Sequence, residues 1–165
     1  MKSSFAKHRQ NRAISIRVFI AVISLALGLV CTELLARNEP HPVAKEMKMA
    51  AQRMAQAEAV VAKKRLAMGL PIDPVLDPYQ TGLIGVESSI LTTTVGDIVS
   101  KRTSTNTAFA ALIVRYFYDI GLEPGDRIAV GSSGSFPAIL LAVLSACAET
   151  RVEPIVITSI GASEY

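Results

Sequence analysis

The sequence predicts an α/β protein with an apolar N-terminal helix, a long amphipathic helix and a doubly wound parallel sheet. Three observations predict this class. Residues 14–36 form one apolar stretch, and apolar residues recur at helical spacing from 43 to 61. Beyond residue 82, short apolar runs and helical patterns alternate as strand, helix, strand, helix, strand. Because 50% of the 165 residues are hydrophobic and only 19% are charged, a disordered chain is excluded.

The N-terminal segment has the pattern of a signal-anchor. Its basic residues precede the uncharged run of residues 18–32, and no acidic residue accompanies them: Lys2, Lys7, Arg9, Arg12 and Arg17. Residues 14–36 are long enough to span about 30 Å of hydrocarbon. The charge asymmetry predicts a cytoplasmic basic tail (1–13), a single-pass transmembrane helix (14–36) in the cell membrane and an extracytoplasmic main domain. A cleaved signal peptide and a buried core helix are the alternatives.

Composition excludes several classes of site. Outside the basic N-terminus the chain is slightly acidic, tryptophan is absent and aromatic residues make up 5%, so we expect no nucleic-acid binding. Cys31 and Cys147 form no Cys-x-x-Cys motif, so a zinc site or a disulfide framework is excluded. We expect no metal and no cofactor, and we interpret Cys147 as a core thiol.

Residues 37–70 are interpreted as a linker followed by an amphipathic helix. Gly69 and Pro71 mark its end. The helix is either a stalk or packed on the following domain, or else it forms a dimeric coiled coil. Its apolar seam contains Val43, Met47, Ala50, Met54, Ala57 and Val61.

Residues 71–165 are predicted to be a partial, Rossmann-like α/β domain that begins with the proline-rich turns of 71–79. Three strands leave one face of the sheet thinly covered. We therefore expect a fragment of a longer domain, or cover from the 43–68 helix or another chain. The expected strands are 83–86, 127–131 and 154–158, and the expected helices are 106–120 and 137–148. The inner face of the first helix is predicted to hold Phe109, Leu112, Ile113, Tyr116, Phe117 and Ile120.

Candidate site residues follow the strands, and in a parallel sheet such loops meet at one edge. Residues 87–94 with 101–106, 131–135 and 159–163 bring hydroxyl groups there, together with Glu87, Lys101 and Arg102. The loop of Gly131, Ser132, Ser133, Gly134 and Ser135 is either an anion cradle of backbone amides or a plain turn. Glu87 is either a ligand contact or an exposed loop residue.

A catalytic interpretation is also open. Ser135 or Ser133 would be the nucleophile, and Lys101 the base. No histidine follows His41, so this domain cannot assemble a Ser-His-Asp triad. In the alternative, Lys101 and Arg102 bind carboxylates or face solvent.

Several of these segments, in order, resemble the poly-gamma-glutamate system protein family of bacterial membrane-associated proteins. The resemblance covers residues 79–165 and is carried by 82–87, 92–94, 101–106, 125–126, 131–138 and 159–163. It implies a part in capsule or exopolymer biosynthesis, without implying a mechanism. It also implies that the domain continues beyond Tyr165 in family members.

The resulting expectation is a membrane-anchored accessory protein of poly-gamma-glutamate biosynthesis or export. Its crevice would bind the anionic polymer or a precursor, and the synthesis and export proteins would be its partners. A serine-based hydrolase or transferase acting on the polymer, and a purely structural docking subunit, are the alternatives.

Overall fold

The computed structural model describes residues 18–33 and 40–164, in two units, Met1–Pro40 and His41–Tyr165. In the first unit, residues 18–33 are helical and exposed. Among the described residues, no helix has the length and apolar character needed to cross a membrane. The predicted basic tail lies outside the described residues, as do both ends of the predicted anchor, residues 14–17 and 34–36.

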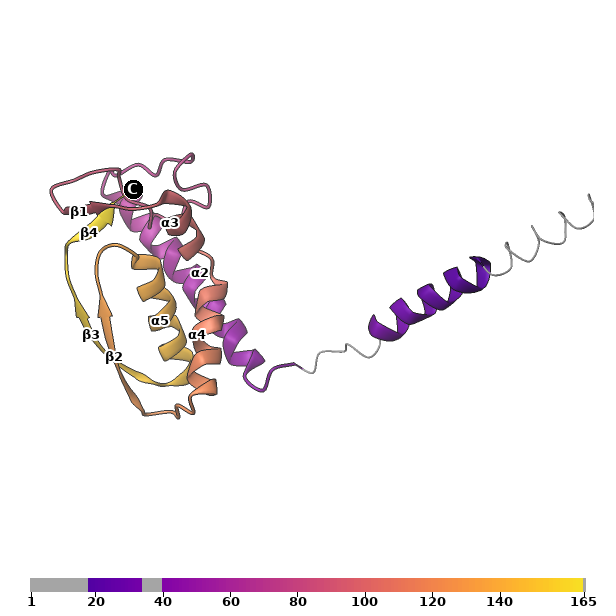
Figure 1. The fold of residues 1–165 in the computed structure, drawn as a ribbon. Helices are drawn as coiled ribbons and strands as arrows, with labels where there is room; N and C mark the ends of the chain where they lie inside the picture. Colours follow the sequence, from indigo (N-terminus) through magenta and orange to yellow (C-terminus); the bar gives the residue numbers. More distant parts are fainter. Residues whose placement is uncertain (1–17, 34–39, 165) are drawn as a thin grey trace, which may run out of the picture. The chain divides into compact units, whose positions relative to one another are not determined.

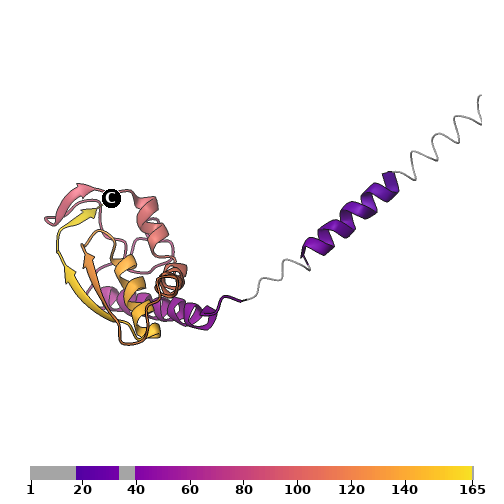
Figure 2. The ribbon, with the colours of Figure 1, turned by 60° about the horizontal axis from the view of Figure 1, so that its bottom comes forward.

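The second unit is a mixed α/β structure with short parallel sheets. Strand β2 pairs with β3 and strand β1 pairs with β4, both in parallel. Helix α5 lies between the β2–β3 pair and the helices α2 and α4 (Figure 1, Figure 2). The helices are α2 (Ala44–Ala67), α3 (Ile98–Ser104), α4 (Ala108–Asp119) and α5 (Pro137–Thr150). The strands are β1 (Thr92–Val95), β2 (Arg127–Ser132), β3 (Glu153–Thr158) and β4 (Ala162–Glu164).

The β2–α5–β3 unit confirms the strongest part of the sequence pattern. Pro137 starts α5, where its missing N–H costs nothing and its fixed φ suits the helix. In register, Arg127 faces Glu153 and Ser132 faces Thr158, so the two strands run together over their whole length. The expected exposure of one sheet face is also present, since Ile155 is 57% and Ile157 76% exposed.

Helix α2 packs against α4 and α5, which supports the interpretation of a helix packed on the following domain. Only part of the expected seam is buried, at Ala50 and Met54, and the buried stripe continues to Glu58. Gly69 ends the helix with φ of +76°, a conformation that glycine adopts without steric cost.

The core is rich in alanine, and this changes the inner face of α4. Small side chains let helix backbones approach closely, so α4 buries Ala110 and Val114 with Phe117. Of the predicted inner-face residues, Tyr116 and Ile120 are exposed, and that part of the prediction is wrong. The buried core cluster comprises Ala50, Met54, Ala110, Val114, Phe117, Ala138, Ala142, Ala146, Cys147 and Val152, which confirms Cys147 as a core thiol.

The predicted strand at 83–86 is wrong, because these residues are irregular and the first strand is β1. The chain passes close to α2 at Gly82, where an added Cβ would lie 2.9 Å from the Ala62 Cα. Arg65 then donates hydrogen bonds to the carbonyl oxygens of Gly82 and Ile84. These carbonyls are satisfied by a side chain of α2, so this segment packs as a loop instead of joining a sheet.

Candidate functional site

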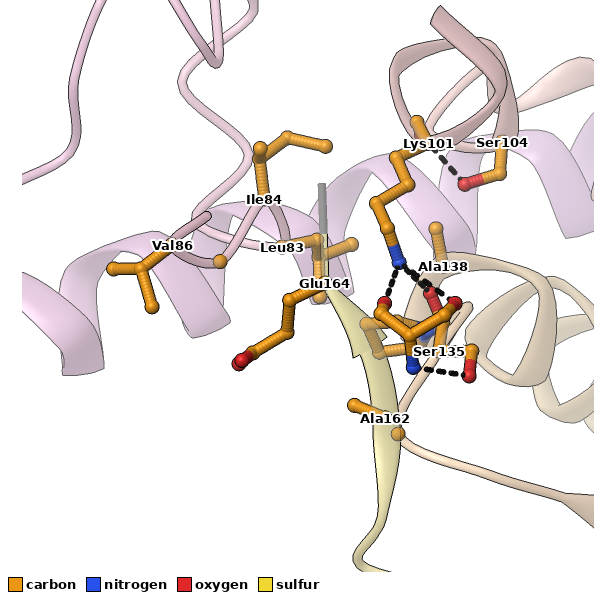
Figure 3. A pocket seen from close by; sticks show the side chains of 13 residues that line it. Leu83, Ile84, Val86, Lys101, Ser104, Ser135, Ala138, Ala162 and Glu164 are labelled. Atoms are coloured by element: carbon orange, nitrogen blue, oxygen red, sulfur yellow. Dashed lines mark hydrogen bonds between the residues drawn. The ribbon is translucent and has the colours of Figure 1, made fainter. Parts of the chain in front are cut away.

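A cavity of about 160 Å³ lies where the predicted site segments meet. Its lining comes from residues 83–86, helix α3, the β2–α5 connection, the start of α5 and strand β4 (Figure 3). The predicted convergence is therefore present in part: residues from 101–106, 131–135 and 159–163 line the cavity, whereas none from 87–94 does, and a helix and a strand supply residues expected in loops. We call this the Lys101 cavity, after the cation at its wall.

Helix α3 is capped at its N-terminus by Asp97, whose carboxylate accepts hydrogen bonds from the Ser100 N–H and hydroxyl, both at 2.7 Å. These bonds hold the pKa of Asp97 below its usual value. The prediction of a loop is therefore wrong for residues 101–104, since aspartate is a preferred N-cap residue whose side chain accepts a backbone N–H of the first helical turn. The helix fixes Lys101 on its inner side.

Lys101 is buried, with 7% of its surface exposed. Its Nζ donates to the Ser135 carbonyl oxygen at 2.5 Å and to the Ser163 carbonyl oxygen, and it lies 4.9 Å from the centre of the Phe136 ring. Burial lowers the pKa of Lys101, and the nearby Glu164 carboxylate opposes that shift. Lys101 thus joins α3, the β2–α5 connection and β4 at one point (Figure 3).

The Gly131–Ser135 loop uses its amides within the chain. The Gly134 N–H donates to the Gly161 carbonyl oxygen at 3.2 Å, and the Ser135 N–H donates to Ser133 Oγ at 3.3 Å. An added Cβ on Gly134 would lie 3.0 Å from the Ile160 carbonyl oxygen. The close approach of the backbone at Ile160 therefore accounts for a glycine at position 134. The amides of Gly134 and Ser135 both donate within the chain, so they do not form an open anion cradle. Gly131 and Ser132 belong to β2, where they face Ile157 and Thr158.

The serine hydroxyls also have partners in the chain. Ser135 Oγ accepts the Ser163 N–H at 2.8 Å, while Lys101 bonds to the carbonyl of Ser135. Ser133 is exposed. Within the described residues, no hydrogen bond joins Lys101 Nζ to the hydroxyl of Ser133 or Ser135. The predicted Ser-Lys pair is therefore brought close in space without the contact that base catalysis requires.

Arg102 and Glu87 do not line the Lys101 cavity. Arg102 is on another side of α3, where Nε donates to the Leu76 carbonyl oxygen at 2.8 Å and Nη2 donates to the Val75 carbonyl oxygen at 2.7 Å. Glu87 is exposed and does not line the cavity. The expectation that Lys101 and Arg102 act on one crevice is wrong, since neighbouring residues of a helix point in different directions.

Glu164 is the lining residue that sequence reasoning missed. Its carboxylate accepts hydrogen bonds from the hydroxyls of Ser89, at 3.1 Å, and Thr92. These bonds, with a smaller contribution from Lys101, lower the pKa of Glu164, so it is ionised at neutral pH. In Figure 3 its carboxylate points away from the Lys101 ammonium. The sequence holds no signal for this role, because Glu164 is the last residue of β4, a strand that no pattern predicted.

No group of three or more histidine, cysteine, aspartate or glutamate side chains suited to a metal ion occurs in the part of the chain that the structure describes. Comparisons with protein-family models, with curated proteins and with solved structures found no match for this chain. The family resemblance of residues 79–165 therefore stays a prediction.

Proposed function

We propose that this chain is a membrane-anchored accessory protein of bacterial poly-gamma-glutamate biosynthesis or export, and that its Lys101 cavity binds a carboxylate of the anionic polymer or of a precursor. In this proposal residues 14–36 are the anchor, the Rossmann-like α/β unit is extracytoplasmic, and the synthesis and export proteins are its partners. The observation that carries the proposal is a buried lysine ammonium on the wall of a small, hydroxyl-lined cavity.

The hydrogen bonds of Lys101 leave it suited to one anionic group. An ammonium has three protons, and two carbonyl oxygens accept from this one. The third proton faces Ser163 Oγ only at 3.5 Å, so a ligand oxygen can compete for it. A charge-assisted bond to a carboxylate is stronger than a neutral one.

The size of the cavity favours a single group over a whole molecule. Its volume of about 160 Å³ is below the range of about 300–1,000 Å³ typical of small-molecule sites. A polymer that offers a carboxylate at every residue can place one of them in such a cavity. Several modest contacts along the polymer would then combine.

The origin of the lining residues also supports a shared binding role for the segments that carry the family resemblance. The resembling segments 82–87, 101–106, 131–138 and 159–163 each contribute to the wall of this one cavity. Segments that are far apart in the sequence thus meet where the proposed ligand binds.

Glu164→Gln tests the proposal by a gain of binding. Removing the negative charge from the cavity wall relieves repulsion of an incoming carboxylate, and glutamine still offers an oxygen to Ser89 and Thr92. We expect affinity for poly-γ-glutamate oligomers to rise about three- to ten-fold, the effect of one nearby charge at a partly exposed site. The measurement is calorimetric titration of the full chain at low and high salt.

Glu153→Gln is the matched control. It removes the same charge from β3, at the strand end away from the cavity, where Glu153 is exposed and pairs with Arg127. The proposal predicts little change in affinity for this variant. Absence of oligomer binding by the wild-type chain, or equal affinities for the two variants, would reject the carboxylate-binding site.

A further inference from the structure

A second cavity, of about 620 Å³, lies on the side of α3 that carries Arg102. Its volume falls within the range of about 300–1,000 Å³ typical of small-molecule sites. Glu58 of α2 and Arg102 of α3 both line it, with the polar side chains of Thr81, Thr103, Thr105 and Asn106. We call it the Glu58 cavity.

Glu58 is only 8% exposed, and its buried Oε1 has no hydrogen-bond partner. A buried carboxyl oxygen without a partner costs free energy, so native structures rarely keep one. The neighbouring Asp77 is also buried, but its carboxylate accepts from the Thr81 hydroxyl at 3.1 Å and the Gly82 N–H at 2.7 Å. Both of these bonds fall on Asp77 Oδ2, and Asp77 does not line the cavity, so Glu58 is the acid of the two whose buried, unpartnered oxygen belongs to the cavity wall.

Arg102, the cation of this cavity, forms no ion pair with Glu58. In the described part of the chain, no ion pair joins Glu58 to Arg102 or to any other basic side chain. The Arg102 guanidinium is held by Val75 and Leu76 through Nε and Nη2. Its Nη1 protons, which make no hydrogen bond in the structure, can bind a carboxylate.

From this arrangement we infer that the Glu58 cavity binds a small zwitterion, an α-amino acid, with its ammonium on Glu58 and its carboxylate on Arg102. The ammonium supplies donors for the orphaned carboxyl oxygen. The threonine hydroxyls and Asn106 supply uncharged hydrogen-bonding groups for the rest of the ligand. A simple anion is disfavoured because Glu58 and Asp77 repel it.

The charge state of Glu58 gives the inference a pH signature. Burial, and then the nearby Asp77, raise the pKa of Glu58 to about 7. The other titratable or charged groups of the lining are Tyr79 and Arg102, and the α4 end contributes only the uncharged Asn106 and Thr107. Because an ammonium binds the carboxylate form, ligand binding releases a proton from Glu58 near pH 7. Affinity should therefore fall as the pH drops below about 7.

The test is calorimetric titration of the full chain at pH 8 with L-alanine, L-glutamine, ethylamine and propionate. We expect at least one of the two amino acids to bind, ethylamine to bind more weakly and propionate to show no binding. Glu58→Gln should weaken amino-acid binding at least tenfold. Arg102→Gln should reduce it to the level of ethylamine, because only the carboxylate contact is lost.

Glu46→Gln, on the same helix outside the cavity, is the matched control and should leave binding unchanged. Thermal unfolding of each variant shows whether it is folded, and Glu58→Gln removes an unpaired charge, so it is expected to fold. Binding of propionate as strong as that of the amino acids, unchanged binding by Glu58→Gln, or no binding of either amino acid would overturn the inference. The result is independent of the Lys101 cavity.

Discussion

The two cavities lie on different sides of α3 and treat a buried charge in opposite ways. In the Lys101 cavity the ammonium is bonded to two backbone carbonyl oxygens, and the space left is small. In the Glu58 cavity a carboxyl oxygen is buried without a partner, and the space is about four times larger by volume, 620 against 160 Å³. The Lys101 ammonium mainly holds segments of the chain together, whereas the Glu58 carboxyl lacks a hydrogen-bond partner, which a ligand can provide.

The largest expected effect is that of Lys101→Met. The substitution removes the charged donor of two hydrogen bonds, so the carbonyl oxygens of Ser135 and Ser163 lose that partner. Each lost bond costs about 1.5–3 kcal/mol. We expect the free energy of unfolding to fall by about 3 kcal/mol or more in urea denaturation of the full chain. Lys48→Met, at an exposed position of α2, is the control and should change little. A stability equal to that of the wild type would show that Lys101 does not hold these segments.

Glu58→Gln should have the opposite effect on stability. A carboxyl whose pKa rises from 4.5 to about 7 on folding destabilises the protein at pH 8 by about 3 kcal/mol. Below pH 4.5 the carboxyl is protonated in both the folded and the unfolded protein, and folding carries no penalty. The stability is lost as the pH rises from 4.5 to about 7. The variant should therefore be more stable than the wild type at pH 8, by about 2–3 kcal/mol, and equal to it below pH 4.5.

Denaturation of both proteins across this pH range measures the effect. Glu46→Gln serves again as the control and should retain the pH dependence of the wild type. A Glu58→Gln variant that is less stable than the wild type at pH 8 would mean that the carboxylate is satisfied, and the contrast between the two cavities would fail.

A smaller effect is expected for Gly134→Ala, which probes the backbone contact beside the Lys101 cavity. The new methyl group would lie 3.0 Å from the Ile160 carbonyl oxygen and 3.1 Å from the Ala162 Cβ, so β4 must shift. We expect a loss of about 1–2 kcal/mol, the usual cost of overpacking. Gly131→Ala meets nothing within 4 Å and is the matched control. Equal stabilities of the two variants would show that β4 moves without cost.

Prediction from the sequence succeeded where one element carries a strong local signal. Gly69 ends α2 with a positive φ, Pro137 begins α5, and the apolar strand β3 follows α5 as expected. The prediction failed at residues 83–86, because an apolar run has the same sequence pattern in both cases, whether a neighbouring strand or Arg65 of α2 donates to its carbonyl oxygens. It also missed α3, because residues 101–104 of that helix were expected in a loop.

The sequence by itself determined the helices α2 and α4, the β2–α5–β3 unit and the gathering of residues 101, 134 and 135 near one edge, since these follow from hydrophobic period and from parallel topology. Only the tertiary structure decided that Lys101 and Arg102 face separate cavities and that Glu164 lines one of them. It alone also placed Glu58, a polar residue in an otherwise apolar seam, in a buried position. The physical reason is that the direction of a side chain and the partner of a buried charge depend on neighbours far away in the sequence.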